Sequence, residues 1–452
     1  MKILPLVVIV AGVIRADAAP TFSPQPCRPS LAKASARCGT VIVPEDPTAT
    51  NGRTIALNVV IVPALKKAAA NVPMFHLEGG PGVAATNAAE FYVGPGSLYR
   101  QTRDVVLFDQ RGTGGSNPLR CPALEHRSPL EEMYSDSDVI RCREALAAKA
   151  DLTSYSTERA ADDVDVVRQA LGYRTIDIWA LSYGTRLAQE YIKRFPDRVS
   201  HAVLVGFVSS NYRPPLFHAV NAQRVMDLIF YKCQRDAECS SKYPHLRAEW
   251  ESLRRSLPIT IPYGPFAEAL RSLLGVAANQ RQVPAMIHAG AGGDFSPFLE
   301  RLPKDSSIFA EGVYLSIACS EGAAQINQDE IERTTNGTFL GDYRVKQELA
   351  ACANWPKVSP RPGYFEPLKS SPPILVLAGE MDNVAAPEWG YQFCAMLPKC
   401  RYVLVPDMGH GPFDLDAWEN GSCFDEMAVA FYEQPASLDV SCVGRMRPPK
   451  FK

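Results

Sequence analysis

Short apolar runs recur along the first half of the chain, and glycine, aspartate or serine bounds each of them. They cover residues 73–77, 104–108, 176–181 and 199–208. Apolar side chains on both sides of a strand are typical of central strands in a parallel sheet that is covered on both faces. We therefore predict four buried parallel strands in this part of the chain.

Two further strands and a helix complete the pattern of this region. Residues 40–44 and 54–62 are rich in valine and isoleucine and flank the turn signal Asn51-Gly52, which predicts an antiparallel hairpin. Residues 158–171 carry apolar side chains at the spacing of an amphipathic helix. This alternation of strands and helices predicts an α/β layered fold.

The pattern changes after residue 208. Over residues 209–370 the apolar positions have helical spacing, broken by proline and glycine, and no convincing series of strands occurs. The strand pattern returns at residues 373–378 and 402–405 and flanks a helix-like run. We expect a core in residues 20–208 and 371–452, interrupted by a helical domain at 209–370. The helices expected in that domain cover residues 219–231, 245–257, 266–274 and 298–302.

The first residues have the composition of a secretory signal. Met1 and Lys2 precede an apolar stretch over residues 3–14, and small residues follow up to Ala19. A helix that crosses a membrane needs about 20 apolar residues, so this stretch is too short for an anchor. We expect a cleaved signal peptide at 1–19, a secreted or periplasmic protein, and no integral membrane segment after cleavage.

Export changes the expectation for the twelve cysteines, because oxidising compartments favour disulfides. Sequence does not fix their connectivity, but proximity along the chain favours six pairs. No Cys-x-x-Cys occurs, and no histidine stands at ligand spacing from a cysteine pair, so we expect no metal. The six pairs are Cys27–Cys38, Cys121–Cys142, Cys233–Cys239, Cys319–Cys352, Cys394–Cys400 and Cys423–Cys442.

Charge excludes one class of partner. The 452 residues include 47 lysines and arginines against 49 aspartates and glutamates, for a net charge of -2. A protein that binds nucleic acid needs a basic face or stripe, so no nucleic acid partner is expected. Oligomeric state does not follow from the sequence.

A serine stands directly after one of the predicted strands. Ser182 follows the strand at residues 176–181, has Gly184 two positions later, and precedes a helical run at 186–195. A sharp turn between strand and helix would expose the hydroxyl near a helix N-terminus, as a nucleophile requires. The usual pattern has glycine where this chain has Ala180, and such a serine can also be a simple helix cap.

Two later strand ends carry the residue types that activate a serine. Asp382 follows the strand at 373–378, and His410 follows the strand at 402–405. The order Ser, Asp, His is one of the orders in which hydrolase triads occur. Upstream, the loop at residues 77–82 contains three glycines around a proline, which lets a backbone N–H approach a ligand closely.

With these motifs the chain resembles the α/β-hydrolase superfamily, and more narrowly the proline iminopeptidase and tripeptidyl aminopeptidase group of secreted serine exopeptidases. The resemblance covers residues 40–435. It implies an α/β-hydrolase fold, with a mostly parallel sheet, helices on both faces and a helical cap. The motifs that carry it are Gly79-Gly80-Pro81-Gly82, the segment 109–116, Ser182-Tyr183-Gly184-Thr185 and Gly409-His410.

The resemblance implies roles for individual residues. Ser182 would be the nucleophile, His410 the base and Asp382 the carboxylate that orients it, while the N–H groups of Gly80 and Tyr183 would form the oxyanion hole. No cofactor is needed.

Two acids are candidates for binding a substrate amino group. They are Glu321, near the first cysteine of the Cys319/Cys352 pair, and Glu78, beside the glycine-rich loop. Each can equally be a solvated acid or an ion-pair partner. Trp355 either lines an apolar pocket or packs within the cap.

The sequence favours an aminopeptidase that removes proline or a short peptide from free amino termini through an acyl-enzyme on Ser182. A carboxylesterase or lipase with the same triad is the main alternative, since the fold does not choose between ester and amide. A binding protein without catalysis is a third alternative. The number of residues released and any requirement for proline stay open.

Overall fold

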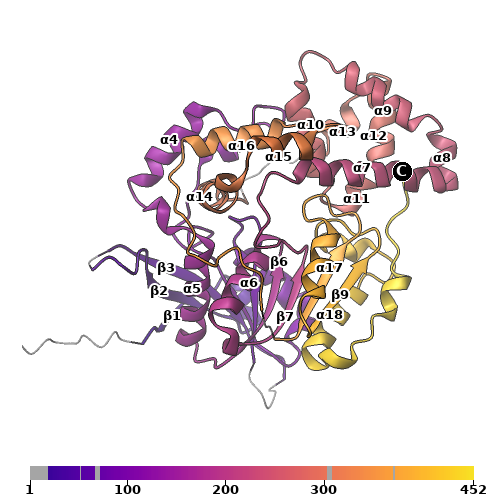
Figure 1. Ribbon diagram of the computed structural model, residues 1–452. Coiled ribbons are helices and arrows are strands. Elements are labelled where there is room, and N and C mark those ends of the chain that lie inside the picture. Colours follow the sequence, from indigo (N-terminus) through magenta and orange to yellow (C-terminus); the bar gives the residue numbers. More distant parts are fainter. Residues whose placement is uncertain (1–18, 51, 67–71, 303–307, 370–371) are drawn as a thin grey trace, which may run out of the picture.

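The structure is a computed structural model (Figure 1). The expected signal peptide, apart from Ala19, and the turn residue Asn51 lie outside the described residues. The described residues are 19–50, 52–66, 72–302, 308–369 and 372–452.

A nine-stranded sheet forms the centre of the described chain, in the order β1-β2-β3-β5-β4-β6-β7-β8-β9. The pairs along β1-β2-β3-β5 are antiparallel, and the remaining neighbours are parallel. The strands are β1 (Phe22–Gln25), β2 (Arg37–Pro44), β3 (Thr54–Val62), β4 (Met74–Leu77), β5 (Val105–Phe108), β6 (Ile176–Leu181), β7 (Val199–Val205), β8 (Ile374–Gly379) and β9 (Cys400–Val405).

The apolar runs form buried strands, as predicted. Every position of β4, β5, β6 and β8 is buried, because helices cover both faces of the sheet. The hairpin of β2 and β3 is confirmed as well. β1 was not predicted, because this edge strand is mostly exposed and contains Pro24, so its sequence lacks an apolar pattern.

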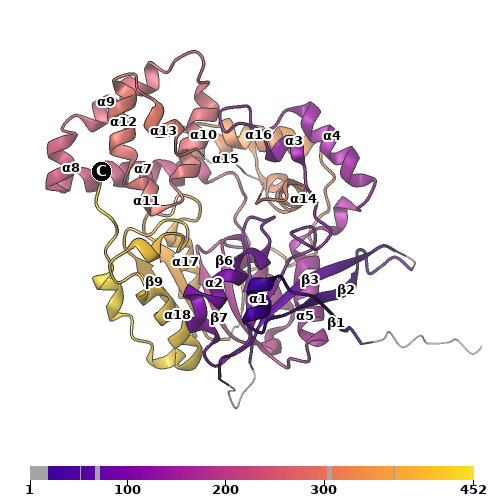
Figure 2. The ribbon, with the colours of Figure 1, turned by 180° about the vertical axis from the view of Figure 1, so that it is seen from behind.

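Neighbouring positions of β6 face different layers. Ile178 belongs to one hydrophobic cluster and Trp179 to another on the opposite face. The predicted helix at 158–171 is confirmed as α5. Figures 1 and 2 show the two layers: α5 (Thr157–Ala170), α6 (Tyr183–Arg194) and α17 (Pro387–Ala395) on one face, and α1 (Pro29–Lys33), α2 (Ala89–Val93) and α18 (Cys423–Glu433) on the other.

Only helices and short 3-10 turns occur between β7 and β8 in the described chain, and they lie over the carboxyl ends of the strands (Figure 1). Some of these helices were not predicted. In α14, nine of eleven residues are buried, so no polar face marks it as amphipathic. The helices are α7 (His218–Arg235), α8 (Ala237–Lys242), α9 (Leu246–Arg255), α10 (Tyr263–Leu273), α11 (Ala277–Gln280), α12 (Val283–Ala291), α13 (Ser296–Leu299), α14 (Glu311–Glu321), α15 (Gln328–Thr335) and α16 (Tyr343–Ala353).

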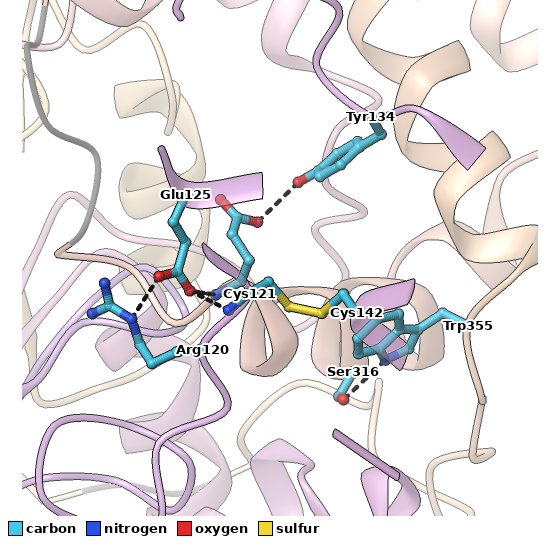
Figure 3. Close-up of a disulfide and its surroundings, with 8 residues drawn as sticks. Arg120, Cys121, Glu125, Tyr134, Cys142, Ser316 and Trp355 are labelled. Atoms are coloured by element: carbon cyan, nitrogen blue, oxygen red, sulfur yellow. Dashed lines mark hydrogen bonds and ion pairs between the residues drawn. A yellow bond between two sulfur atoms is a disulfide. The ribbon is translucent and has the colours of Figure 1, made fainter. Parts of the chain in front are cut away.

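All six disulfides predicted from proximity are confirmed. Figure 3 shows Cys121–Cys142, which joins the residue before α3 (Pro122–Glu125) to α4 (Asp136–Ala147). Glu125 accepts hydrogen bonds from Arg120 Nε at 2.6 Å and from the Cys121 N–H at 2.7 Å. The disulfide and these hydrogen bonds therefore both fix the segment from Arg120 to Glu125, against which α14 packs.

Disulfides that close longer loops should stabilise the fold more. Cys319 and Cys352 are separated by 33 positions, whereas Cys394 and Cys400 are separated by six. Loop-closure entropy predicts losses of about 4 and about 2 kcal/mol when each pair is replaced by alanines. Thermal unfolding of the two double variants measures the difference. Equal losses, or a larger loss for the short loop, would contradict this account.

Candidate active site

The site lies where the connections of the sheet diverge. The chain passes from β4 to β5 on one side and from β6 to β7 on the other, while β4 and β6 are parallel neighbours. In open α/β sheets a cleft forms outside the carboxyl ends of the strands at such a point. The glycine-rich loop after β4 and Ser182 after β6 therefore meet at one edge.

Ser182 occupies a sharp turn between β6 and α6. Its backbone has φ 54° and ψ -124°, a conformation that non-glycine residues rarely adopt. A side chain at Gly184 would place its Cβ 2.0 Å from the carbonyl oxygen of Leu77. This close approach explains the glycine two positions after Ser182, while Ala180 fits the buried end of β6 where the usual pattern has glycine.

Ser182, His410 and Asp382 form one hydrogen-bonded cluster. Ser182 Oγ lies 2.8 Å from His410 Nε2, and His410 Nδ1 lies 2.9 and 3.0 Å from the two carboxylate oxygens of Asp382. The N–H groups of Val384 and Ala385 donate to Asp382 Oδ1 at 2.7 and 2.8 Å. With the carboxylate fixed, His410 donates through Nδ1, which leaves Nε2 able to accept the serine proton.

The glycine-rich loop lies directly against this cluster. A Cβ on Gly79 would stand 3.0 Å from Ser182 Cβ, and Gly80 has φ +109°. Gln110 Nε2 donates to the Glu78 carbonyl oxygen at 3.0 Å, so the segment 109–116 supports the glycine-rich loop through this hydrogen bond. Gly80 and Tyr183, the expected oxyanion donors, line the same cavity as Ser182.

This cavity, which we call the Ser182 cavity, has a volume of about 420 Å³. The sheet edge forms one wall and the helical insertion forms the other, with Tyr212, Phe309, Tyr314 and Ile317 among its apolar and aromatic residues. Its charged lining is uneven, since Glu78 is the one carboxylate among the described lining residues. The arginines that line it are Arg186, Arg271 and Arg344.

Glu78 keeps its negative charge at the edge of this cavity. Its carboxylate oxygens lie 2.8 Å from His76 Nε2 and 2.8 Å from the Gly79 N–H. Burial disfavours the charged form, but these hydrogen bonds and the attraction of His76 outweigh burial and lower the pKa of Glu78. A fixed carboxylate thus stands beside the loop that carries Gly80.

Glu321, one of the two candidates for binding a substrate amino group, does not line the cavity. It is 1% exposed, and its carboxylate accepts hydrogen bonds from the Thr157 N–H and hydroxyl at 2.8 and 2.7 Å and from the Tyr364 hydroxyl. Arg186 Nε lies 3.7 Å away. Protein donors occupy this carboxylate, so the alternative that it is a buried ion-pair partner fits the geometry.

Trp355 packs within the insertion. It is 3% exposed and donates from Nε1 to Ser316 Oγ at 3.0 Å (Figure 3). It is not among the residues that line the Ser182 cavity.

Three residues of the insertion that line the cavity were not predicted as site residues. His218 begins α7, Arg271 lies on α10 and Arg344 on α16. Burial and the two nearby arginines lower the pKa of His218 well below its ordinary value, so its imidazole is neutral. Arg271 and Arg344 each have a glutamate on the same helix face, Glu268 and Glu348, as in surface ion pairs, so no signal in the sequence shows that they line a cavity.

No group of three histidine, cysteine or acidic side chains in the described ranges could hold a metal ion. In the same part of the chain, no helix has the length and apolarity to cross a membrane.

Several known proteins are similar to this chain. The α/β hydrolase fold family matches residues 72–417. Tripeptidyl aminopeptidase of Streptomyces lividans is 24% identical over 428 residues, which cover 83% of this chain and 78% of that protein. Serine protease Hip1 of Mycobacterium tuberculosis (strain H37Rv) is 29% identical over 239 residues, or 47% of this chain. The chain spans only 45% of the length of Hip1.

Many solved structures match most of the chain at low sequence identity. One of them is a proline iminopeptidase-related protein from Thermus thermophilus, with a TM-score of 0.42 and 20% identity over 89% of this chain and 98% of that protein.

Glu321→Gln should destabilise the protein without changing substrate choice. The substitution leaves Arg186 buried without its counter-charge, which should cost about 3 kcal/mol. Thermal unfolding measures this loss, and Glu332→Gln, at an exposed position of α15, is the matched control. A variant of normal stability with a raised KM for free-amine substrates would instead assign Glu321 to substrate binding.

Proposed function

The chain belongs to the α/β hydrolase fold family, and on that basis we propose that it is a secreted serine hydrolase that removes one residue or a short peptide from free amino termini. The observation that carries the proposal is the hydrogen-bonded cluster of Ser182, His410 and Asp382 at the edge of a cavity. Six disulfides and the apolar amino terminus support export.

In the proposed reaction, Ser182 Oγ attacks the carbonyl carbon of the scissile amide. The hydroxyl proton passes to His410 Nε2, and the carbonyl electron pair moves onto oxygen, where the N–H groups of Gly80 and Tyr183 stabilise the charge. The C–N bond then breaks, and His410 gives the proton to the departing amine. Water attacks the resulting acyl-enzyme by the same route and releases the acid.

Asp382 orients the imidazole throughout this cycle. It receives the Nδ1 proton of His410 in a hydrogen bond and is itself fixed by the N–H groups of Val384 and Ala385. This arrangement selects the tautomer whose Nε2 faces Ser182 and stabilises the imidazolium that forms when the serine proton moves.

Two observations favour an aminopeptidase over an esterase. Tripeptidyl aminopeptidases match over 83% of the chain, whereas a relative named carboxylesterase B matches over only 45% of it. In addition, Glu78 places a carboxylate within the Ser182 cavity, where it can pair with a free amino group. A simple ester offers no group that would need this charge.

The cluster makes a direct prediction for activity. Ser182→Ala should lower kcat by about 10⁶-fold, and Asp382→Asn by about 10⁴-fold because the imidazole adopts the wrong tautomer. Hydrolysis assays and covalent labelling of Ser182 by a phosphonate measure both effects. An unlabelled Ser182 in active protein, or undiminished activity of Ser182→Ala, would rule out the mechanism.

Glu78→Gln tests the recognition of the amino group. We expect KM for free-amine peptide anilides to rise about tenfold, as expected for loss of one charged partner, and kcat to fall, while 4-nitrophenyl acetate is hydrolysed no more slowly than by the wild type. Glu90→Gln, at an exposed position of α2, is the control. Wild-type turnover of esters but not of peptides would favour the esterase alternative, and equal rates on free and blocked peptides would refute the aminopeptidase.

A further inference from the structure

A second cavity of about 720 Å³ adjoins the Ser182 cavity. The two cavities share Glu78, Leu181 and Phe413 as lining residues. The second cavity lies on the face of the sheet that carries α2 and α18, which Figure 2 shows together. A chain bound at Ser182 therefore has a second space within reach, on the far side of Glu78.

Aromatic side chains dominate this second space, which we call the aromatic cavity. Three carboxylates stand among them, those of Glu78, Asp416 and Asp425, and none of its described lining residues is lysine or arginine. Aromatic faces and carboxylates together favour an organic cation. The aromatic residues are Phe91, Tyr92, Tyr99, Trp179, Phe413 and Trp418.

The two aspartates lack a cationic partner. Asp425 accepts a hydrogen bond from the Tyr99 hydroxyl at 2.7 Å, and Asp416 is exposed at the rim. In the described ranges no lysine or arginine lies within ion-pair distance of either one. Burial raises the pKa of Asp425, and a bound cation would offset that effect by favouring its charged form.

Trp179 adds an unused hydrogen-bond donor. It is 6% exposed, lines the aromatic cavity, and its Nε1 has no hydrogen-bond partner among the described residues. Its ring stacks on His76, with centroids 4.7 Å apart, and His76 bonds to Tyr92 at 2.7 Å and Glu78 at 2.8 Å. Buried donors normally find partners, so this indole suits a carbonyl of a bound peptide.

The Ser182 cavity offers an ammonium group fewer partners. Glu78 is the one carboxylate in its described lining. Its arginines pair with carboxylates outside that lining, Arg186 with Glu321 and both Arg271 and Arg344 with Glu268, so they add no attraction for a cation. The two cavities thus differ in their number of carboxylates, and Glu78 stands at their junction.

We propose that the aromatic cavity binds the free amino end of the substrate's acyl segment, while the scissile carbonyl lies at Ser182. The proposal rests on the proposed aminopeptidase function and adds to it the place and the chemistry of amino-group recognition. The ligand class is a peptide with a primary alkylammonium at its amino end. Aromatic faces and the three carboxylates of this cavity, Glu78, Asp416 and Asp425, bind the ammonium. The Trp179 indole donates to a backbone carbonyl.

A binding experiment tests the cavity without any turnover. Calorimetry on Ser182→Ala protein would compare benzylammonium with the neutral benzyl alcohol. We expect benzylammonium to bind at least about tenfold more weakly when Asp416→Asn and Asp425→Asn are added. Asp425→Asn retains an amide oxygen for the Tyr99 hydroxyl, and Asp416→Asn changes only an exposed residue, so folding is preserved. Asp227→Asn, an exposed change on α7, is the control for loss of a carboxylate outside the cavity.

Kinetics on protein with an intact Ser182 then identify which end of the substrate is bound. The Asp416→Asn/Asp425→Asn pair should raise KM for free-amine tripeptide anilides about tenfold and leave N-acetyl anilides unchanged. A second comparison uses two peptides that carry either lysine or norleucine just after the scissile bond. Only the lysine peptide has a cationic side chain in the leaving segment. A defect confined to the lysine peptide would overturn the assignment to the amino end, as would unaltered benzylammonium binding. Absence of turnover on every substrate would refute the proposed function instead, and calorimetry would still decide whether the cavity binds an ammonium.

Discussion

The site depends on one close contact between two turns. The turn at Ser182 holds a backbone conformation that costs about 1–3 kcal/mol for a residue with a side chain. It persists because Gly184 lies against the Leu77 carbonyl and Gly79 lies against Ser182, so two glycines let β4 and β6 bring their ends together. The same contact sets the loop that carries Gly80 beside the hydroxyl. One packing contact therefore positions both the proposed nucleophile and the proposed oxyanion donors.

The other half of the site depends on the helical insertion. Arg224 of α7 donates to the carbonyl oxygens of Glu380 and Asp382 at 2.8 and 2.5 Å. The carbonyl oxygen of Gly275, just after α10, accepts the His410 N–H at 2.9 Å. These bonds attach the insertion to both strand-end turns that carry the carboxylate and the imidazole. The insertion is thus part of the frame that holds the cluster, besides forming one wall of the Ser182 cavity.

The strands, and the order of Ser182, Asp382 and His410 along the chain, could be predicted because each has a local signal in the sequence. A buried strand needs an apolar run, and a residue after a strand end must lie at the carboxyl edge of a parallel sheet. No local feature of the sequence shows which carboxylate faces the cavity. Glu321 sits on a helix buried on almost every side, so its position near Cys319 did not reveal that Thr157 and Tyr364 would occupy it. The charged wall of the Ser182 cavity was not predicted, for a related reason. Arg271 and Arg344 come from separate helices and meet through Glu268, and such partners depend on how the helices of the insertion cross.

In the proposed function, Glu78 links substrate recognition to chemistry through its charge. A carboxylate hydrogen-bonded to the Gly79 N–H stands next to the loop whose N–H groups face developing negative charge, and by itself it disfavours that charge. An ammonium bound beside Glu78 compensates this negative charge just where the transition state needs it. A substrate with a free amino end therefore gains more in the transition state than in the ground state, which is the condition for raising kcat and not only affinity. A blocked substrate leaves the charge of Glu78 uncompensated, so the same carboxylate that attracts one substrate slows reaction of the other.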